Sequence, residues 1–363
     1  MNTTPPRAAS GPDLGAARQQ VDSVLVDFLA RKTVVAAAQR LPTETIEALA
    51  DFIMAGGKRL RPTLCAAGWH AAAGQQPPPK GVLQVAASLE MFHAFCLIHD
   101  DIMDHSPTRR GRPTVHRALA DRHITSRPQV LAEQFGNAAA ILIGDLALIW
   151  SDELIHTAGL ALGQLTTLLP LLDAMRAEVV YGQYLDLTGT GRPTDDIGQA
   201  LTVIHYKTAK YTVERPLHIG AALAGADGQF LAELSRFALP LGEAFQLRDD
   251  LLGVFGDPQR TGKPALDDLR EGKHTVLVAL ALQAADDAQK RLLHTLYGSA
   301  CVDEEDAEAV RAVLRATGAD QAVERMITER YEQALTALGS LPAPAEAHSQ
   351  LRALADRAVC RTS

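Results

Sequence analysis

Residues 89–104 read LEMFHAFCLIHDDIMD, a strongly apolar run that ends in Asp100, Asp101 and Asp104. Its apolar residues predict a buried helix, in which Asp100 and Asp104 share one face at about 100° per residue. Neighbouring carboxylates repel one another, most strongly beside apolar residues, and a divalent cation removes that conflict. Hard oxygen ligands of this kind suit Mg²⁺. The alternative, for this cluster alone, is a solvated acidic helix end.

A second apolar run ends in the same way. Residues 243–257 read EAFQLRDDLLGVFGD, with Asp249 and Asp250 as an acidic pair and Asp257 a little beyond. Two such runs, about 150 residues apart in the chain, predict carboxylates that face one another across a pocket. That arrangement can hold a metal-bridged diphosphate from both sides.

The remaining chain shows helical periodicity and no sustained β-type alternation. The predicted helices are 21–40, 44–55, 60–74, 81–104, 130–159, 161–188, 197–223, 228–255, 274–296, 303–317 and 319–339, with a short final helix after the loop near residues 341–347. We therefore predict one all-α domain over residues 19–363, a helical bundle around a central cavity. Residues 1–18, rich in Pro, Gly, Ala and Thr, are predicted to be a disordered tail.

Composition narrows the functional class. A net charge of −8 argues against a nucleic-acid binder. Cys65, Cys96, Cys301 and Cys360 have no CxxC spacing, so we expect reduced thiols in a cytoplasmic protein. The N-terminus lacks the layout of a signal peptide, and the apolar stretch 154–172 carries too many polar residues for a membrane span. We expect no integral membrane segment.

A diphosphate also needs cations from the protein. Residues 56–62 read GGKRLRP, and residues 109–113, just beyond the first acidic cluster, read RRGRP. Glycine permits close approach of the backbone to phosphate, and arginine can bind it through two parallel hydrogen bonds. Further candidates are Lys207, Lys263 and Lys273. Taken singly, each of these residues is more typical of a solvated surface.

These motifs together closely resemble the trans-polyprenyl (isoprenyl) diphosphate synthase family. The matching elements are GGKRLRP (56–62), ExxHxxxLIHDDIMD (90–104), RRGRPTVH (109–116), KTA (207–209), FQLRDD (245–250) and GKPALDDLREGKHT (262–275). They follow the family's order over roughly residues 50–275. The resemblance implies the all-α isoprenoid-synthase fold, usually as a homodimer.

The resemblance also implies roles, residue by residue. Asp100, Asp104 and Asp249 would ligate Mg²⁺, as three ions bound together with the diphosphate, and Asp101 and Asp250 would support them. Arg109, Lys207, Lys263 and Lys273 would bind the allylic diphosphate. Lys58, Arg61, His93 and Arg110 would bind isopentenyl diphosphate, and Thr208 and Gln246 would lie against the reacting carbons.

Two positions depart from the family pattern. The second acidic motif commonly carries a third aspartate, where this chain has Gly253. Asp257 could partly substitute for it. Lys210 adds a cation directly after the KTA element, for which the sequence offers no account.

The implied reaction joins isopentenyl diphosphate to dimethylallyl, geranyl or farnesyl diphosphate by ionisation, condensation and elimination. Phe95 and Cys96 lie about one helical turn before Asp100, where a growing chain would extend. In the family, a Phe followed by a small residue is typical of synthases that reach geranylgeranyl diphosphate. We predict that product, with farnesyl diphosphate as the alternative.

Other functions fit the sequence less well. A class I terpene cyclase shares the fold but normally carries an Asn/Ser/Glu-type second metal site and needs no second diphosphate site. A head-to-head synthase of the squalene or phytoene type is disfavoured by the same motifs. A non-catalytic subunit of a heteromeric synthase usually loses one or both acidic clusters, and both are present here.

Overall fold

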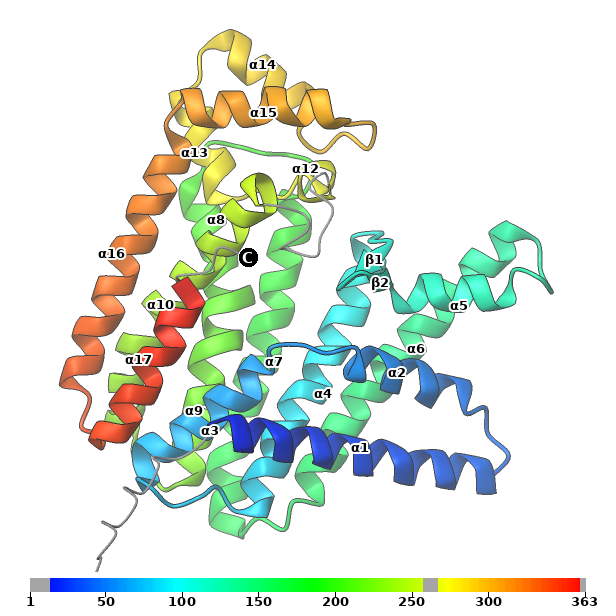
Figure 1. Ribbon diagram of the computed structural model, residues 1–363, viewed down its shortest axis with the longest axis vertical. Helices are drawn as coiled ribbons and strands as arrows, with labels where there is room; N and C mark the ends of the chain where they lie inside the picture. Colours follow the sequence, from blue (N-terminus) through cyan, green and yellow to red (C-terminus); the bar gives the residue numbers. More distant parts are fainter. Residues whose placement is uncertain (1–13, 257–266, 360–363) are drawn as a thin grey trace, which may run out of the picture.

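The computed structural model describes residues 14–256 and 267–359, and helices dominate it (Figure 1). In chain order they are α1 Leu14–Ala38, α2 Glu44–Met54, α3 Leu60–Ala73, α4 Lys80–Met103, α5 Val115–His123, α6 Gln129–His156, α7 Leu162–Gly189, α8 Ile197–Val203, η1 Ile204–Glu214, α9 Arg215–Leu223, α10 Gly228–Phe255, α12 Asp267–Glu271, α13 Val276–Ala284, α14 Asp287–Leu296, α15 Glu304–Ala316, α16 Ala319–Ser340 and α17 Ala345–Val359. A short hairpin, β1 Thr108–Arg109 and β2 Arg112–Pro113, follows α4. The predicted all-helical class is confirmed.

The core consists of two apolar clusters, one on each side of the bundle. One cluster surrounds α4, which packs on α6, α3 and α1. The other surrounds α10, which packs on α16 and η1. Figure 1 shows α4, α7 and α10 in the middle of the molecule, with α1 and α2 crossing one side and α16 and α17 the other. The two acidic helix ends thus come from the central helices of different clusters.

Helix α4 is apolar on nearly every side, as its sequence predicts. It is also the one helix in the described part of the chain that is long and apolar enough to cross a membrane. Of its most apolar window, 67% is buried inside the protein. That burial is typical of a core helix, and the stretch 154–172 is instead divided between α6 and α7.

The segment predicted as one helix over 197–223 contains a wider helical turn. Residues Ile204–Glu214 form a π-helix, η1, between α8 and α9. Two glycines allow η1 to lie against its neighbours. A Cβ at Gly182 of α7 would lie 2.5 Å from the backbone nitrogen of Lys207, and one at Gly242 of α10 would lie 2.5 Å from Ala209 Cα. Wide turns of this kind frequently occur at functional sites.

Two local predictions were wrong. The segment 274–296 is two helices, α13 and α14, because Asp286 and Gln289 form a capping box that starts a new helix. The hairpin and α5 were not predicted, because the glycine and prolines of this segment indicate only a break between helices. Gly111 turns the hairpin at a φ of 71°, a conformation that glycine adopts readily.

Helix α1 begins at Leu14, inside the segment 1–18 that the sequence predicts to be a tail. Residues 14–18 are therefore helical. Residues 1–13 lie outside the described residues, so the prediction for them stays a prediction, as does the single-domain boundary.

Candidate active site

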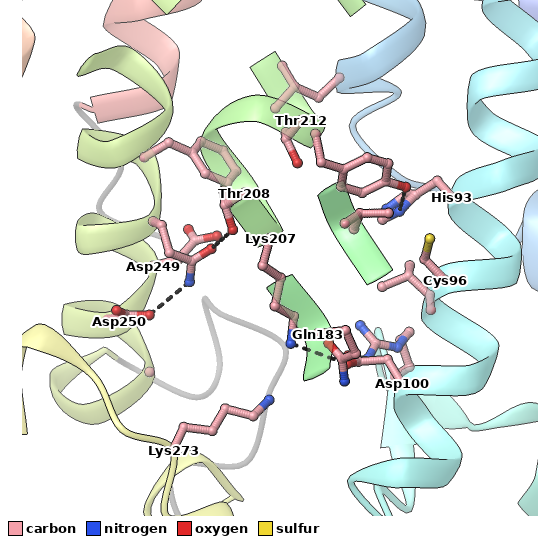
Figure 2. Close-up of a pocket in the computed structure, with 18 of the residues that line it drawn as sticks. His93, Cys96, Asp100, Gln183, Lys207, Thr208, Thr212, Asp249, Asp250 and Lys273 are labelled. Atoms are coloured by element: carbon pink, nitrogen blue, oxygen red, sulfur yellow. Dashed lines mark hydrogen bonds and ion pairs between the residues drawn. The ribbon is translucent and has the colours of Figure 1, made fainter. Parts of the chain in front are cut away.

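A cavity of about 980 Å³ lies between α4, α7, η1 and α10. Asp100 and Asp249 both line it, which meets the central expectation from the sequence (Figure 2). The other predicted residues on its wall are Lys58, Arg61, His93, Phe95, Cys96, Arg109, Arg110, Lys207, Thr208, Gln246, Asp250 and Lys273. Gly253 lines it as well, in place of the family's third aspartate. Residues from distant parts of the chain thus share one hollow.

Asp100 lies at the carboxyl end of α4 among cations. Lys207 Nζ is 3.4 Å from Asp100 Oδ1, and Arg109 Nη2 is 3.7 Å from Asp100 Oδ2. Burial raises the pKa of Asp100, but Lys207, Lys273 and Arg109 outweigh it, so this pKa lies below its ordinary value. The carboxylate is therefore ionised at neutral pH.

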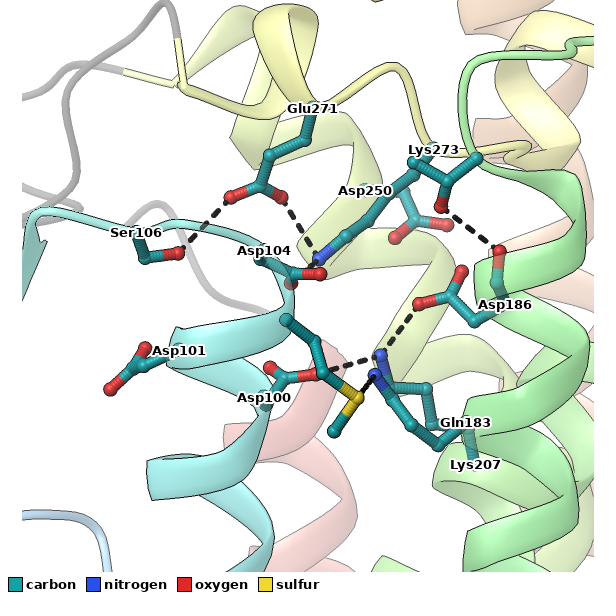
Figure 3. A network of polar contacts seen from close by, with 12 residues as sticks. Asp100, Asp101, Asp104, Ser106, Gln183, Asp186, Lys207, Asp250, Glu271 and Lys273 are labelled. Carbon is teal, nitrogen blue, oxygen red and sulfur yellow. Dashed lines mark hydrogen bonds and ion pairs between the residues drawn. The ribbon is translucent and has the colours of Figure 1, made fainter. Parts of the chain in front are cut away.

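Asp104 and Lys273 form a second pair at the rim, 2.8 Å apart. Lys273 also contacts Glu271 at 2.9 Å, and Glu271 accepts a hydrogen bond from Ser106 (Figure 3). Burial lowers the pKa of Lys273, but Asp104 and Glu271 outweigh it and raise this pKa well above its ordinary value. Asp104 is not part of the cavity wall; its link to the cavity is Lys273.

Asp101 points to the other side of α4, away from the network around Asp100 (Figure 3). Its carboxylate is buried and accepts hydrogen bonds from Arg109, with the closest N–O distance at 2.6 Å. Burial raises the pKa of Asp101 even though Arg109 opposes the shift. This placement agrees with a supporting role, in which Asp101 orients Arg109.

The second acidic cluster is tied to η1 through one hydrogen-bond chain. Thr208 donates to Gln246 Oε1 at 2.8 Å, and Gln246 Nε2 donates to Asp250 Oδ1 at 2.8 Å. Asp249 lines the cavity beside them (Figure 2). The hydrogen bonds thus fix Thr208 and Gln246 in the wall of the cavity.

The third group of polar residues lies at the start of α3. Arg61 is buried, donates to Thr212 Oγ1 at 2.6 Å and lies 4.2 Å from the ring centre of Tyr211. Arg110 donates to the carbonyl of Gly56. Lys58 lines the same part of the cavity. These cations are the ones that the family resemblance assigns to isopentenyl diphosphate, and all three line the cavity.

His93 is a neutral member of this group. Burial lowers its pKa well below the ordinary value, and Arg61, Arg110 and Arg109 lower it further. Its Nδ1 is 3.2 Å from the hydroxyl of Tyr211. His93 can therefore serve a diphosphate as a hydrogen-bonding group, but not as a cation.

Three functional candidates escaped the sequence analysis. Asp186 is buried on α7, and its Oδ2 lies 2.6 Å from Lys207 Nζ. Gln183, one turn earlier, and Tyr211 of η1 both line the cavity. The i, i+3 spacing of Gln183 and Asp186 indicates that both side chains lie on one face of a helix. That spacing does not identify Lys207 as the partner of Asp186.

The unexplained Lys210 has a structural role. Its Nζ lies 2.8 Å from Glu178 Oε1 of α7, and Arg215 contacts the same carboxylate at 2.6 Å. These ion pairs fasten η1 to α7. Lys263 and Asp257 lie outside the described residues, so their predicted roles stay predictions.

The carboxylates fit Mg²⁺ that is shared with a ligand. In the described ranges, no three carboxylate, histidine or cysteine side chains are close enough to form a complete metal site by themselves. Mg²⁺ is usually held by one or two carboxylates together with substrate phosphates. Asp100 on α4 and Asp249 on α10 offer such single oxygen donors across the cavity.

Comparisons with known proteins agree with this geometry. The family model described as Polyprenyl synthetase matches residues 43–315. The chain belongs to the polyprenyl synthetase family. It is 31% identical over 345 residues to geranylfarnesyl diphosphate synthase of Aeropyrum pernix, covering 94% of this chain and 99% of that protein. It is 34% identical over 260 residues to geranylgeranyl diphosphate synthase of Mycobacterium tuberculosis, covering 70% and 67%.

Among solved structures, this polyprenyl synthetase is similar to geranylgeranyl pyrophosphate synthase from Corynebacterium glutamicum, crystallised with isoprenyl diphosphate and magnesium. The TM-score is 0.91 and the identity 40%, covering 96% of this chain and 99% of that one. The match extends beyond the family model to almost the whole chain, so the fold of the terminal helices is shared as well.

The apolar part of the cavity in this family member begins one turn below Asp100. Phe95 packs its ring 5.3 Å from that of Phe92 and 4.8 Å from that of His99. Cys96, beside it, has its pKa raised to about 11 by burial, so it is a neutral thiol. Val179 and Val180 of α7 face them across the cavity.

Proposed function

We propose that the chain is a Mg²⁺-dependent trans-prenyltransferase that condenses isopentenyl diphosphate with allylic diphosphates. One observation carries the proposal: carboxylates from α4 and α10 and two groups of cations line a single cavity with an apolar extension. Two cationic groups match two diphosphate substrates, which a terpene cyclase would not need. Asp100 and Asp249, one from each acidic cluster, both line the cavity, which disfavours a non-catalytic subunit.

The first step separates charge, because diphosphate leaves the allylic carbon as an anion. Mg²⁺, when bound by Asp100, Asp104 and Asp249, supplies positive charge to the departing diphosphate. Lys207, Lys273 and Arg109 add donors that are already held in place by carboxylates. Such preorganised charges stabilise a transition state without reorganising during the reaction.

The allylic cation must then be kept from water until the second substrate attacks. Phe95, Val179 and Val180 provide apolar walls for the hydrocarbon chain. The hydroxyl of Thr208 and the amide of Gln246 can offset the transient positive charge near the reacting carbons. The released diphosphate is the base we propose for the final proton loss.

Geranylgeranyl diphosphate is the product that we propose, with farnesyl diphosphate as the alternative. The bulk of Phe95 beside the small Cys96 supports a short chain, and so does the similarity to geranylgeranyl diphosphate synthases. The geranylfarnesyl diphosphate synthase that is 31% identical to this chain is named for a longer product. Product length therefore has to be measured.

We also propose a homodimer through α6 and α7. These helices carry most of the large apolar side chains exposed in the described part of the chain, among them Leu142, Ile149 and Tyr181. Tyr184 and Leu187 line the cavity and are still 65% and 39% exposed. A second copy on this face would close the cavity wall.

Free Cys65, Cys96 and Cys301 are compatible with the cytoplasmic location predicted from the sequence.

The test is incubation with Mg²⁺, isopentenyl diphosphate and each allylic primer in turn, followed by chromatography of the dephosphorylated products. We expect C20 alcohol to predominate and no product after chelation of Mg²⁺. Incubation with geranylgeranyl diphosphate alone is the control for cyclase activity. A hydrocarbon or cyclic alcohol in that control, without chain extension elsewhere, would overturn the proposal.

A further inference from the structure

Arg59 stands between two cavity-lining cations, Lys58 and Arg61, but its guanidinium is buried in a different set of contacts. Its Nε donates to Asp22 Oδ1 at 2.7 Å, Nη1 to Glu90 Oε1 at 2.9 Å and Nη2 to the carbonyl of Ile53 at 2.8 Å. Only 5% of Arg59 is exposed. One side chain thus joins α1, α2 and α4 at the base of the loop before α3.

The backbone at Arg59 needs this support. Its φ of 48° lies in the left-handed region, which side chains other than glycine disfavour. Gly56 and Gly57 before it also have positive φ, at 98° and 150°. The three hydrogen bonds of Arg59 hold this loop at the point where α3 begins.

Helix α1 contacts the same loop through a second residue. Arg18 Nη2 donates to the carbonyl of Gly57 at 2.9 Å. Neither Arg18 nor Asp22 lines the cavity. Arg61, which follows in the same segment, lines the cavity and carries a buried Nε without a hydrogen-bond partner.

We propose that the triad Asp22–Arg59–Glu90 positions Lys58 and Arg61, so that α1 sets the affinity for the second, homoallylic diphosphate. The inference rests on the proposed function and deepens it. Asp22 acts through Arg59 and touches no substrate. Loss of its carboxylate removes no residue from the cavity wall, and it loosens the loop that carries Lys58 and Arg61.

The variant Asp22→Asn tests the proposal, because it keeps side-chain size and removes the charge. We expect its KM for isopentenyl diphosphate to rise roughly tenfold, the effect of one lost charge-assisted hydrogen bond. The KM for the allylic substrate and the melting temperature should stay near the parent values, within about 3 °C for the latter. Asp27→Asn, at an exposed position of the same helix, is the matched control. Arg18→Gln should raise the same KM by a smaller factor.

Calorimetric titration with isopentenyl diphosphate separates this proposal from the proposed function, since it needs no turnover. If the parent is inactive and Asp22→Asn binds isopentenyl diphosphate more weakly than the parent, the result would support the positioning role of the triad and contradict the proposed prenyltransferase activity. Equal binding to parent and Asp22→Asn, or an equal rise in both KM values, would overturn the triad. A parent that does not bind isopentenyl diphosphate overturns both.

Discussion

Asp100 lies among several charged side chains. It lies at the end of an apolar helix, and Lys207 and Arg109 neutralise it. The lysine has a second carboxylate, Asp186, at 2.6 Å. Removal of the Asp100 charge therefore leaves Lys207 paired, so the fold should tolerate changes that the reaction does not.

Asp100→Asn and Asp249→Asn should each lower kcat by about 10²-fold or more, because each removes charge at the diphosphate. The measurement is incorporation of labelled isopentenyl diphosphate under saturating substrates. Asp173→Asn, at an exposed position of α7, should be as active as the parent. Activity of either cavity variant within tenfold of the parent would contradict these metal-ligand assignments.

The neutral state of His93 makes a prediction about pH. Its pKa in the folded protein lies well below the ordinary value of 6.5. In the unfolded chain the imidazole takes up a proton near pH 6.5. The unfolded state then binds more protons, so stability falls as pH decreases below 6.5, by at most about 1.4 kcal/mol per pH unit from this residue.

His93→Gln removes that titration. Urea unfolding at pH 7.5 and pH 5.0 should show a smaller loss of stability for the variant than for the parent. The pH 7.5 measurement serves as the internal reference for the cost of the substitution itself. The same loss for both proteins between the two pH values would show that His93 is protonated to a similar extent in both states.

We expect the side chain of Phe95 to limit the length of the product. Phe95→Ala should open the space between Phe92, His99 and the α7 wall, and products should lengthen by at least one isoprene unit. Chromatography of dephosphorylated products gives the distribution directly. Phe52→Ala removes the same volume on α2, outside the cavity, and should leave the distribution unchanged. An unaltered spectrum for Phe95→Ala would remove this residue from chain-length control.

Helix η1 packs closely on two neighbouring helices. It carries Lys207 and Thr208 and lies against α7 and α10 through Gly182 and Gly242. The ion pairs of Lys210 and Arg215 with Glu178 fasten it from the other end. The wide turn thereby places a lysine and a threonine in the cavity at a spacing set by tertiary contacts.

Gly182→Ala should push η1 away from α7, because the new Cβ would lie 2.5 Å from Lys207 N. We expect a loss of about 1–3 kcal/mol in unfolding free energy and a fall in kcat of about tenfold or more, since Lys207 is displaced. Gly163→Ala in the same helix is the control, as nothing lies within 4 Å of its Cβ. A rise in stability with full activity for Gly182→Ala would show that η1 can shift freely.

For the whole molecule, the exposed apolar face of α6 and α7 is the main unexplained surface. Leu142 is 63% exposed and Ile149, seven residues later on the same side, is 58% exposed. Exposed apolar patches of this kind typically mark interaction sites. The proposed dimer would cover this face and the open side of the cavity together.

Leu142→Glu should convert the dimer to a monomer, since a buried unpaired carboxylate would oppose association. Light scattering during gel filtration gives the mass. Gln321→Glu adds the same charge at an exposed position of α16, on the other side of the molecule, and should stay dimeric. A parent that is monomeric at micromolar concentration would contradict the dimer.

The sequence by itself determined the all-helical class, the ends of α4 and α10, and the cations that accompany them. Helical periodicity and motif spacing are local properties, so they can be read along the chain. Asp100 and Asp249 were assigned to one cavity because both end apolar helices, and the structure places them there. The predicted segment 274–296 failed where a single capping box overrode the apolar pattern.

Only the tertiary structure decided which charges meet. Asp186 pairs with Lys207, Lys273 pairs with Asp104, and Arg59, although it lines the cavity, pairs with Asp22 and Glu90. The wide turn of η1 likewise lies close to α7 and α10 at two glycines of those helices. Pairing of this kind depends on the relative positions of helices far apart in the chain, and no periodicity within one segment records those positions.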